Sequence, residues 1–544
     1  MKNLPLKTYF VWSAHVANKI RWSLLAETLI GLIRVGASLL FVYVCKALID
    51  IATGVSAASL PLYALGLLAI VVAQILLSAA DSYLHTVAHA RLSIYLRGYL
   101  FNHLLYLRYS GRKHRHTGDT TNRLEQDVQE VSSTLSADLP SVITTCFQFL
   151  TAFLFLFYLE RTLAWITASI MPVCLILSKI FIKKMRQLTH NIRTTDSRLQ
   201  SFLQESLQNL TLFQTLEYES KAIRSLDTLH TELYAHTMHR SRFSIFSRSL
   251  VAFAFALGYV VAFLWGVQGI LLGTVSYGMM TAFLQLVGQI QRPLVNLSQQ
   301  IPAFIHASTS IDRLVELEEE VREPQFPSHK LQGQLGVRFE AVHYTYPDGT
   351  RKVVDAFTHD FKPGTRTAIL GETGAGKSTL IRLILAVLHP QQGNIFQYNA
   401  TETVEVSTAT RCNIVYVPQG NSLLSGTIRE NLLLGNPQAT DEAMWKALRT
   451  ATADFVTQLP KGLDTYCSER GAGFSEGQAQ RIAIARALLR EGGILLFDEF
   501  SSSLDEETED RLLRNLTENY ANRTMIFITH RPKVTEYCDS VVNV

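Results

Sequence analysis

The sequence predicts a membrane α-helical bundle of six transmembrane helices with long cytoplasmic extensions, fused to an α/β domain of the phosphate-loop type. Three observations predict this combination. Six apolar stretches are each long enough to cross a bilayer, and two long polar stretches of helical character lie between them. A Gly-x-x-x-x-Gly-Lys-Ser loop follows a short apolar strand and opens a helical run, which is the context that a phosphate-binding loop requires.

The composition favours a membrane protein. Of the 544 residues, 48% are hydrophobic and only 18% are charged, which is too apolar for a soluble enzyme of this length. The net charge of +4 is too small to indicate a nucleic-acid partner. The six cysteines form no Cys-x-x-Cys pair, so the sequence indicates neither a zinc site nor a disulfide framework.

The apolar stretches lie at 22–46, 60–82, 139–159, 162–182, 249–273 and 277–300. Each has roughly the 20 residues that a transmembrane helix needs. Very short links separate the third from the fourth and the fifth from the sixth, which forces two antiparallel helical hairpins. Residues 1–20 alternate apolar and polar residues, and we expect an interfacial amphipathic helix there.

Basic residues are concentrated in the two long polar stretches, whereas the outer loops at 51–59, 159–162 and 266–276 carry a single arginine. The positive-inside rule therefore places the long stretches in the cytoplasm, and an even number of spans places both termini there too. We expect the bundle to lie in the plasma (inner) membrane. The segment 201–219 has helical spacing of apolar residues. It fits either a solvated helical extension or a lever that docks on the second domain.

The order of segments predicts the domain boundaries. An acidic helix is expected at 311–321, followed by a segment rich in Pro, Gly and Gln, and from Val337 strands and helices alternate. We expect a transmembrane domain over 1–320, a linker over 321–336 and an ATP-binding domain over 337–544.

The phosphate loop and the helix start after it consist of Gly371, Glu372, Thr373, Gly374, Ala375, Gly376, Lys377, Ser378 and Thr379. Glycines allow successive backbone N–H groups to converge on an anion at a helix N-terminus. Lys377 can reach the β- and γ-phosphates, and Ser378 can bind Mg²⁺. The loop predicts binding of a nucleoside triphosphate.

Two carboxylates, Asp498 and Glu499, end the apolar strand 494–497. Asp498 can hold Mg²⁺ through water, and Glu499 can polarise an attacking water as a general base. Solvated acids at a strand end are the plainer alternative.

The run from Phe474 to Leu488 is the most specific string in the chain and resembles the signature sequence of the ABC transporter family. Four further strings match the same family: Tyr346 resembles the adenine-stacking aromatic, Gln419 the lid glutamine, Ser502–Asp505 the loop at the dimer interface, and His530 the switch histidine. Strings at 118–127 and 273–317 resemble its half-size, six-span exporters (type IV, B-subfamily-like).

The resemblance implies an ATPase coupled to transmembrane movement of substances, with ATP and Mg²⁺ bound. Its implied catalytic residues are Glu499, His530 and Gln419, and its implied metal ligands are Ser378, Gln419 and Asp498. The implied nucleotide-binding residues are Tyr346, the loop residues from Gly371 to Thr379, and Ser475, Gly477 and Gln478.

In the family, the serine that corresponds to Ser475 binds ATP held by a partner subunit. The resemblance therefore implies a dimer with a second copy or a homologous half-transporter, and the intact motifs favour a homodimer. On local grounds, Ser475 and Gln478 also fit a capping box at a helix start. This chain has Glu476 where the family usually has glycine, and we predict that its carboxylate points away from the phosphate.

Polar residues inside the spans indicate where substrate could bind. Arg34 and Glu27 lie in the first span, and Gln285, Gln289 and Arg292 form a stripe along the sixth. These residues fit two interpretations. They could line a substrate cavity, or they could form inter-helix hydrogen bonds or a buried ion pair.

The leading hypothesis is a half-transporter that exports or flips a hydrophobic or amphipathic substrate, which could be a small molecule, a lipid or a peptide. An importer of siderophore type has the same architecture, and a membrane-tethered ATPase regulator is a third possibility. A soluble ATPase of DNA repair or translation conflicts with the six spans. Membrane lipids are expected partners, and nucleic acid is not.

Overall fold

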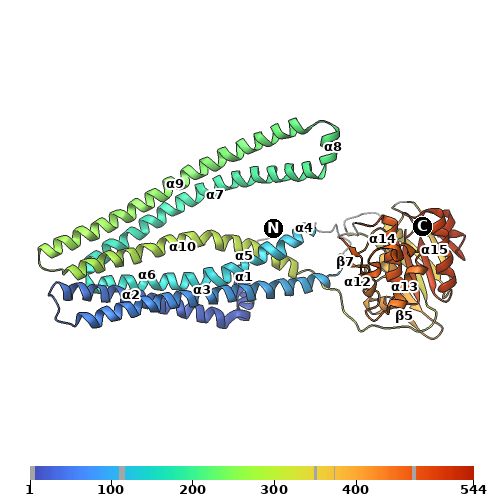
Figure 1. Ribbon diagram of the computed structural model, residues 1–544, viewed down its shortest axis with the longest axis horizontal. Helices are drawn as coiled ribbons and strands as arrows, with labels where there is room; N and C mark the ends of the chain where they lie inside the picture. Colours follow the sequence, from blue (N-terminus) through green and yellow to red (C-terminus); the bar gives the residue numbers. More distant parts are fainter. Residues whose placement is uncertain (1–5, 110–116, 348–351, 373, 469–472) are drawn as a thin grey trace. The chain divides into compact units, whose positions relative to one another are not determined.

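The computed structural model describes residues 6–109, 117–347, 352–372, 374–468 and 473–544. The chain forms two compact units, one made of residues 1–102 and 118–319, the other of residues 103–117 and 320–544. The first is helical and the second is α/β (Figure 1), as the sequence predicts.

The helical unit is built from long helices. They are α1 (Leu6–Ala17), α2 (Arg21–Ala52), α3 (Leu60–Leu105), α4 (Thr117–Asn122), α5 (Val128–Ser133), α6 (Leu139–Leu159), α7 (Arg161–Gln208), α8 (Leu210–Thr215), α9 (Glu219–Leu271) and α10 (Tyr277–Glu318). A 3-10 turn, η1 (Asn18–Ile20), precedes α2, and two π-helical turns, η2 (Arg123–Asp127) and η3 (Thr134–Asp138), flank α5. The short breaks at Glu160 and between α9 and α10 confirm the two predicted hairpins.

Four helical segments of the described chain are long and apolar enough to cross a membrane: 11–52, 60–105, 118–159 and 219–271. They contain the first, second and third predicted spans and all but the last two residues of the fifth. The predicted span 162–182 lies in α7, where part of the side chains is outside the described set. The span 277–300 lies in α10, whose apolar run is interrupted by Gln285, Gln289 and Arg292.

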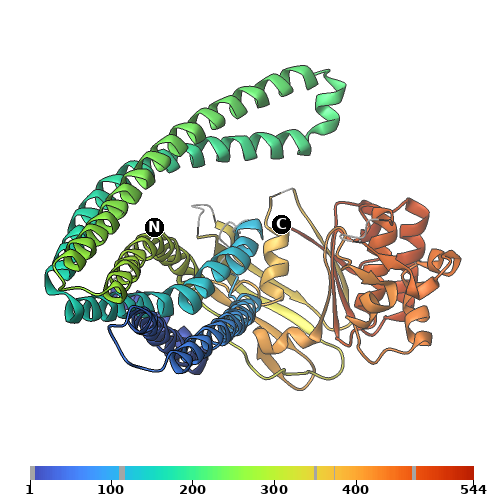
Figure 2. The ribbon, with the colours of Figure 1, turned by 60° about the vertical axis from the view of Figure 1, so that its left-hand side comes forward.

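The bundle packs around α10, which contacts α2, α6 and α9. Its core includes Phe283, Leu286 and Ile290 of α10 against Leu156 of α6 and Val42 of α2. The pair α7 and α9 runs side by side out to the short helix α8 (Figure 1), and the turned view shows the same pair from another side (Figure 2). The predicted helix at 201–219 is interrupted, because α7 ends at Gln208 and Glu217 has a positive φ of 52° before α9 begins.

The α/β unit contains a five-stranded parallel sheet of order β11-β3-β10-β9-β6 and an antiparallel sheet of order β2-β1-β4-β5. The parallel strands are β3 (Arg366–Leu370), β6 (Ile414–Val417), β9 (Ile494–Asp498), β10 (Thr524–Ile528) and β11 (Ser540–Asn543). The antiparallel strands are β1 (Gly336–Thr345), β2 (Lys352–Phe361), β4 (Gln392–Tyr398) and β5 (Thr403–Glu405). The strands β7 (Gly426–Thr427) and β8 (Tyr466–Cys467) pair with each other.

The helices of this unit carry several of the predicted motifs. They are α11 (Lys377–Ile384), α12 (Ile428–Leu433), α13 (Asp441–Thr450), α14 (Glu476–Leu488), α15 (Glu506–Asn519) and α16 (Pro532–Thr535), with 3-10 turns η4 (Thr408–Asn413), η5 (Asp454–Gln458) and η6 (Gly462–Asp464). The strands β9 and β10 are fully buried, with Phe497 and Phe527 stacked at 5.0 Å between ring centroids. A buried parallel strand of this kind reads as a continuous apolar run.

The segment 323–335 has neither helix nor strand, yet it is anchored to the α/β unit. The guanidinium of Arg411 binds the carboxylate of Glu323 and donates to the carbonyl oxygens of Leu385 and Ala386. The side chain of Asn413 donates to His329 and accepts from the backbone N–H of Leu331. Such bonds fix a stretch that composition alone describes as flexible.

Candidate functional site

The phosphate loop connects the carboxyl end of β3 to α11. Gly374 and Gly376 have φ values of 87° and 106°, which L side chains rarely adopt. A Cβ on Gly376 would lie 2.8 Å from the carbonyl oxygen of Val353, so glycine is required there for a second reason. Thr373, a predicted nucleotide-binding residue, lies outside the described residues.

Lys377 opens α11 and is buried, with 7% of its surface exposed. Its ammonium donates to the carbonyl oxygen of Gly371 and lies 2.8 Å from Nε2 of His530. Ser378 is exposed at the start of the helix, next to the buried Thr379. The lysine charge is thus held against the loop that the sequence predicts to bind phosphates.

Four predicted residues form one continuous chain of contacts. Lys377 meets His530, the Nε2 of His530 lies 3.1 Å from Oε1 of Glu499, and Nε2 of Gln419 donates to Oε2 of Glu499 at 2.5 Å. They follow β3, β10, β9 and β6, in the order of these strands across the sheet. Because parallel strands bring their carboxyl ends to one edge, distant motifs meet there.

The backbone at Glu499 is strained, with a φ of 43°. Its N–H donates to the carbonyl oxygen of Ile528, and its carbonyl oxygen accepts from Nε2 of Gln480. Non-glycine residues in this region cost free energy and are held by their surroundings, most often at functional sites.

Asp498 ends β9 and is 8% exposed. Its Oδ2 lies 3.4 Å from the hydroxyl of Tyr416. Burial raises the pKa of the Asp498 carboxyl above its ordinary value, and the charge of Glu499 raises that pKa further. A divalent cation would stabilise the ionised form against both effects.

The chemistry of the predicted metal ligands fits Mg²⁺. Ser378, Gln419 and Asp498 offer only oxygen ligands, the type that Mg²⁺ prefers beside phosphate oxygens. No group of three His, Cys, Asp or Glu side chains arranged for a metal occurs among the described residues.

Tyr346 is tied to the helix that follows the phosphate loop. Its hydroxyl lies 3.1 Å from Oγ1 of Thr379 and accepts a hydrogen bond of 2.8 Å from Arg382. The ring stands edge-on to Tyr344, with centroids 5.1 Å apart. Sequence reasoning missed Arg382, although its place five residues after Lys377 on the same helix was a usable signal.

The signature segment starts α14 with a capping box. Ser475 Oγ accepts from the N–H of Gln478, and Gln478 Oε1 accepts from the N–H of Ser475. Glu476 is exposed. A Cβ on Gly477 would lie 2.8 Å from the carbonyl oxygen of Ser503, so this glycine permits close approach of the 502–505 loop.

Within the described part of the chain, neither Ser475 nor Gln478 makes a hydrogen bond to the loop 371–379. The structure therefore brings Lys377, His530, Glu499 and Gln419 into one chain of contacts, with Asp498 beside Glu499 in sequence. Of the signature run, Gln480 contacts this group through the carbonyl oxygen of Glu499.

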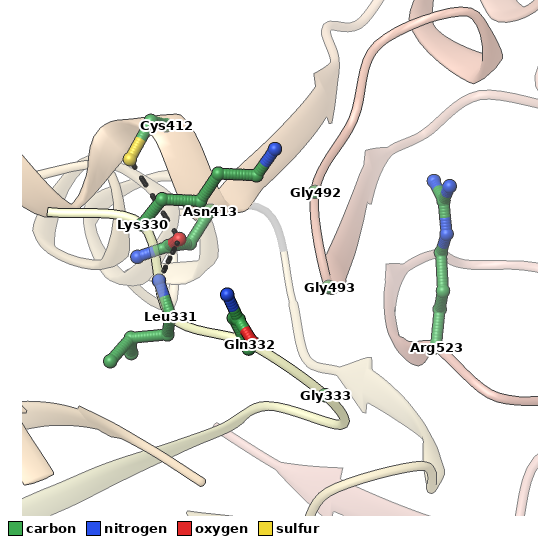
Figure 3. A pocket seen from close by; sticks show the side chains of 9 residues that line it. All are labelled: Lys330, Leu331, Gln332, Gly333, Cys412, Asn413, Gly492, Gly493 and Arg523. Atoms are coloured by element: carbon green, nitrogen blue, oxygen red, sulfur yellow. Dashed lines mark hydrogen bonds between the residues drawn. The ribbon is translucent and has the colours of Figure 1, made fainter. Parts of the chain in front are cut away.

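A cavity of about 430 Å³ lies elsewhere, at the amino-terminal ends of β6, β9 and β10. Figure 3 shows Arg523 on one side of it and Lys330 with Asn413 on the other. The phosphate loop, Gln419, Glu499 and His530 follow the carboxyl ends of β3, β6, β9 and β10, so this cavity is a different place from that group.

Arg34 does not pair with Glu27. It forms an ion pair of 2.7 Å with Asp81 of α3, while Nδ1 of His85 lies 3.8 Å from Glu27. Gln289 donates to Oγ of Ser38 on α2 at 2.8 Å. These contacts agree with the inter-helix alternative for Arg34 and Gln289.

Comparison with known proteins identifies both halves of the chain. The family described as the ABC transporter transmembrane region matches residues 23–294, and the family described as ABC transporter matches residues 354–502. Together they cover the helical unit and the phosphate loop with its paired carboxylates.

Several bacterial relatives extend along most of the chain. An ABC transporter ATP-binding protein of Bacillus subtilis is 29% identical over 454 residues, covering 82% of this chain and 74% of that protein. A fatty acid ABC transporter ATP-binding/permease protein of Mycobacterium tuberculosis is 29% identical, covering 78% and 68%. A leukotoxin translocation ATP-binding protein of Mannheimia haemolytica is 29% identical, covering 87% and 67%.

A solved structure of a bacterial Atm1-family ABC exporter with ATP bound has the same fold, with a TM-score of 0.80 and 24% identity over 96% of this chain and 93% of that one. The chain is an integral membrane protein with an ATP-binding domain. With matching transmembrane and ATP-binding regions in one polypeptide, it belongs to the ABC transporter family, as an ATPase coupled to transport.

Proposed function

We propose that two copies of this chain form an exporter that uses ATP to move or flip an amphipathic or hydrophobic substrate across the plasma membrane. The observation that carries the proposal is the contact chain Lys377–His530–Glu499–Gln419 in a polypeptide that also contains a membrane bundle. A sheet edge that carries a candidate general base favours a transporter that hydrolyses ATP over a membrane receptor that only binds it.

In this proposal Glu499 is the general base for the attacking water, and Gln419 and His530 orient it from either side. Lys377 and the N–H groups of the phosphate loop bind the phosphates. Ser378, Gln419 and Asp498 would hold Mg²⁺, which would supply positive charge beside the phosphates. The strain at Glu499 and its hydrogen bonds to Ile528 and Gln480 position the carboxylate before substrate arrives.

The dimer follows from the isolation of the signature residues. Ser475 offers a positive helix end, yet within the described residues it makes no bond to the loop of its own chain. A second copy related by two-fold symmetry can place its Ser475, Gly477 and Gln478 over the bound ATP. Each site then has two halves, and hydrolysis separates them.

The tip of the helical unit at α8 supports the same assembly. The turn around α8 exposes Leu207, Leu210, Leu212 and Leu216, each with more than half of its surface open. Apolar residues gathered at a helical tip favour a docking contact. We assign this tip to the ATP-binding domain of the second copy, with both of these regions in the cytoplasm.

The substrate class is drawn from chemistry and from relatives. The names of two relatives refer to a fatty acid and to leukotoxin translocation. The first name agrees with an amphipathic cargo. The names of these relatives do not identify the substrate of this chain more closely.

Transport into inverted membrane vesicles tests the proposal. Purified protein in vesicles with outward-facing ATP-binding domains should accumulate a fluorescent amphiphile when ATP is added, and Glu499→Gln should not. Accumulation in right-side-out vesicles loaded with ATP would indicate an importer, and ATP hydrolysis without movement of any amphiphile would favour the regulator.

A further inference from the structure

Helix α2 carries a polar stripe from Glu27 to Cys45. Glu27, Arg34, Ser38 and Cys45 are spaced by seven, four and seven residues, which places them on one face of an α-helix. Eighteen residues at about 1.5 Å each span roughly 27 Å, close to the thickness of a bilayer core. The stripe therefore runs from one side of the membrane to the other.

The first end of the stripe holds an unsatisfied acid. Glu27 is 7% exposed, and its Oε2 has no hydrogen-bond partner among the described residues. The nearest basic group is His85 of α3, whose Nδ1 is 3.8 Å from Oε1, too far for a hydrogen bond, and is itself buried without a partner. A polar atom buried in this way costs free energy until a donor reaches it.

The charges around Glu27 do not balance. α2 contributes Glu27 and Arg34, α3 contributes Asp81, His85 and His89, and η3 contributes Asp138, which interacts electrostatically with His85. Arg34 is paired with Asp81 at 2.7 Å. With neutral histidines, the carboxyl groups of Glu27 and Asp138 have no Lys or Arg ion-pair partner among the described residues, so a cation would complete the cluster.

The other end of the stripe also presents hydrogen-bond acceptors. Gln289 donates its amide to Ser38, and Gln285 lies close to the thiol of Cys45. The carbonyl oxygens of both glutamines are buried without partners among the described residues. Because Gln289 also directs its Nε2 at the main-chain oxygen of Ser38, its free atom is the oxygen.

We propose that Glu27, facing His85, binds the positively charged, N–H-donating head group of the transported amphiphile, an organic ammonium, and that Gln289 and Gln285 continue its path along α2. The inference rests on the proposed export function and names its substrate class. An ammonium supplies the charge and the donors that this stripe lacks. An anionic head group would meet the charge of Glu27 and Asp138 unfavourably.

The experiment compares three amphiphiles with one alkyl chain and different head groups: an ammonium, a neutral alcohol and a carboxylate. ATPase stimulation and uptake are measured in inverted vesicles of phosphatidylcholine. The wild type should respond to the ammonium at the lowest concentration. Glu27→Gln should raise the half-maximal concentration for the ammonium by about tenfold, because a charge-assisted hydrogen bond is lost.

The matched control is Glu160→Gln, which changes an acid in the break between α6 and α7 and should leave the preference for the ammonium unchanged. Size-exclusion elution and ATP binding report whether Glu27→Gln folds. The order of the half-maximal concentrations of the three amphiphiles in the wild type tests the ammonium preference without any variant.

Uptake that favours the alcohol or the carboxylate, or a preference that survives in Glu27→Gln, would overturn this inference and leave export intact. Absence of ATP-driven uptake for all three head groups and for the fluorescent amphiphile would overturn both.

Discussion

The Nε2 atom of His530 lies 3.1 Å from an oxygen of Glu499, which joins the ends of the adjacent strands β10 and β9. The same atom lies 2.8 Å from the ammonium of Lys377. A single imidazole thus contacts both the candidate base and the candidate phosphate-binding lysine, so its removal should affect them together.

Glu499→Gln should keep ATP binding and lose hydrolysis. The amide preserves the size and the contact with Gln419 but cannot accept a proton, so we expect kcat to fall at least about a hundredfold. Steady-state ATPase assays and binding of a fluorescent ATP analogue measure the two effects. Equal rates for wild type and variant would remove Glu499 from the role of base.

His530→Ala should lower kcat by roughly ten- to a hundredfold, with a smaller change in KM, if the histidine acts mainly in the transition state. His389→Ala changes a histidine in the loop before β4 and serves as the control. A variant that raises KM alone would mean that His530 contributes to ATP binding rather than to hydrolysis.

Asp498→Asn should stabilise the nucleotide-free protein at neutral and basic pH. The folded-state pKa of Asp498 is raised by burial, so its contribution to stability is present at acidic pH and is lost as pH rises through that pKa. Asparagine cannot ionise. The increase in Tm over wild type should therefore be larger near pH 8 than near pH 5.

The same variant should lose Mg²⁺-dependent ATPase activity at both pH values, because its carboxylate is a proposed ligand. An Asp498→Asn protein that is less stable than wild type at basic pH, or that hydrolyses ATP normally, would contradict the assignment.

Glu476→Gly should change ATPase activity by less than tenfold. Glu476 begins α14 and is exposed, and an acid in a first helical turn favours the helix dipole. If the carboxylate instead faced the γ-phosphate, glycine would relieve the repulsion and increase the rate more than tenfold. Initial rates at saturating ATP distinguish the two.

Leu212→Asp should uncouple the two domains. Leu212 is 52% exposed at the turn formed by α8, and a charge there would disfavour an apolar docking contact. Stimulation of ATPase by amphiphiles should disappear while ATP binding persists. Thr211→Asp, at a neighbouring exposed position, is the control and should retain most of the stimulation.

Sequence predicted the parts of this protein that depend on local spacing. The phosphate loop, the strand that ends in Asp498 and the capping box at Ser475 all lie within short segments whose residues act on their neighbours. Which of these residues contact one another at the sheet edge depends on the order of the strands, and no single motif reveals that order.

The contacts that the sequence did not predict are those between side chains on different segments of the chain. Arg34 lies two turns from Glu27 on one helix, yet its partner is Asp81 on the next helix. The hydroxyl of Tyr346 is held by Arg382, a residue without a motif of its own. The helical segment expected at 201–219 is broken because the chain must reverse between α7 and α9.

The positive φ of Glu499 has an evolutionary consequence. Glycine, or asparagine to a lesser degree, would adopt this backbone conformation more easily than glutamate does. Substitution of Glu499 by glycine or asparagine can therefore raise thermal stability while it lowers ATPase activity. Selection for thermal stability alone would then favour a protein that no longer hydrolyses ATP. Continued retention of glutamate in a lineage would be a signature of selection for catalysis.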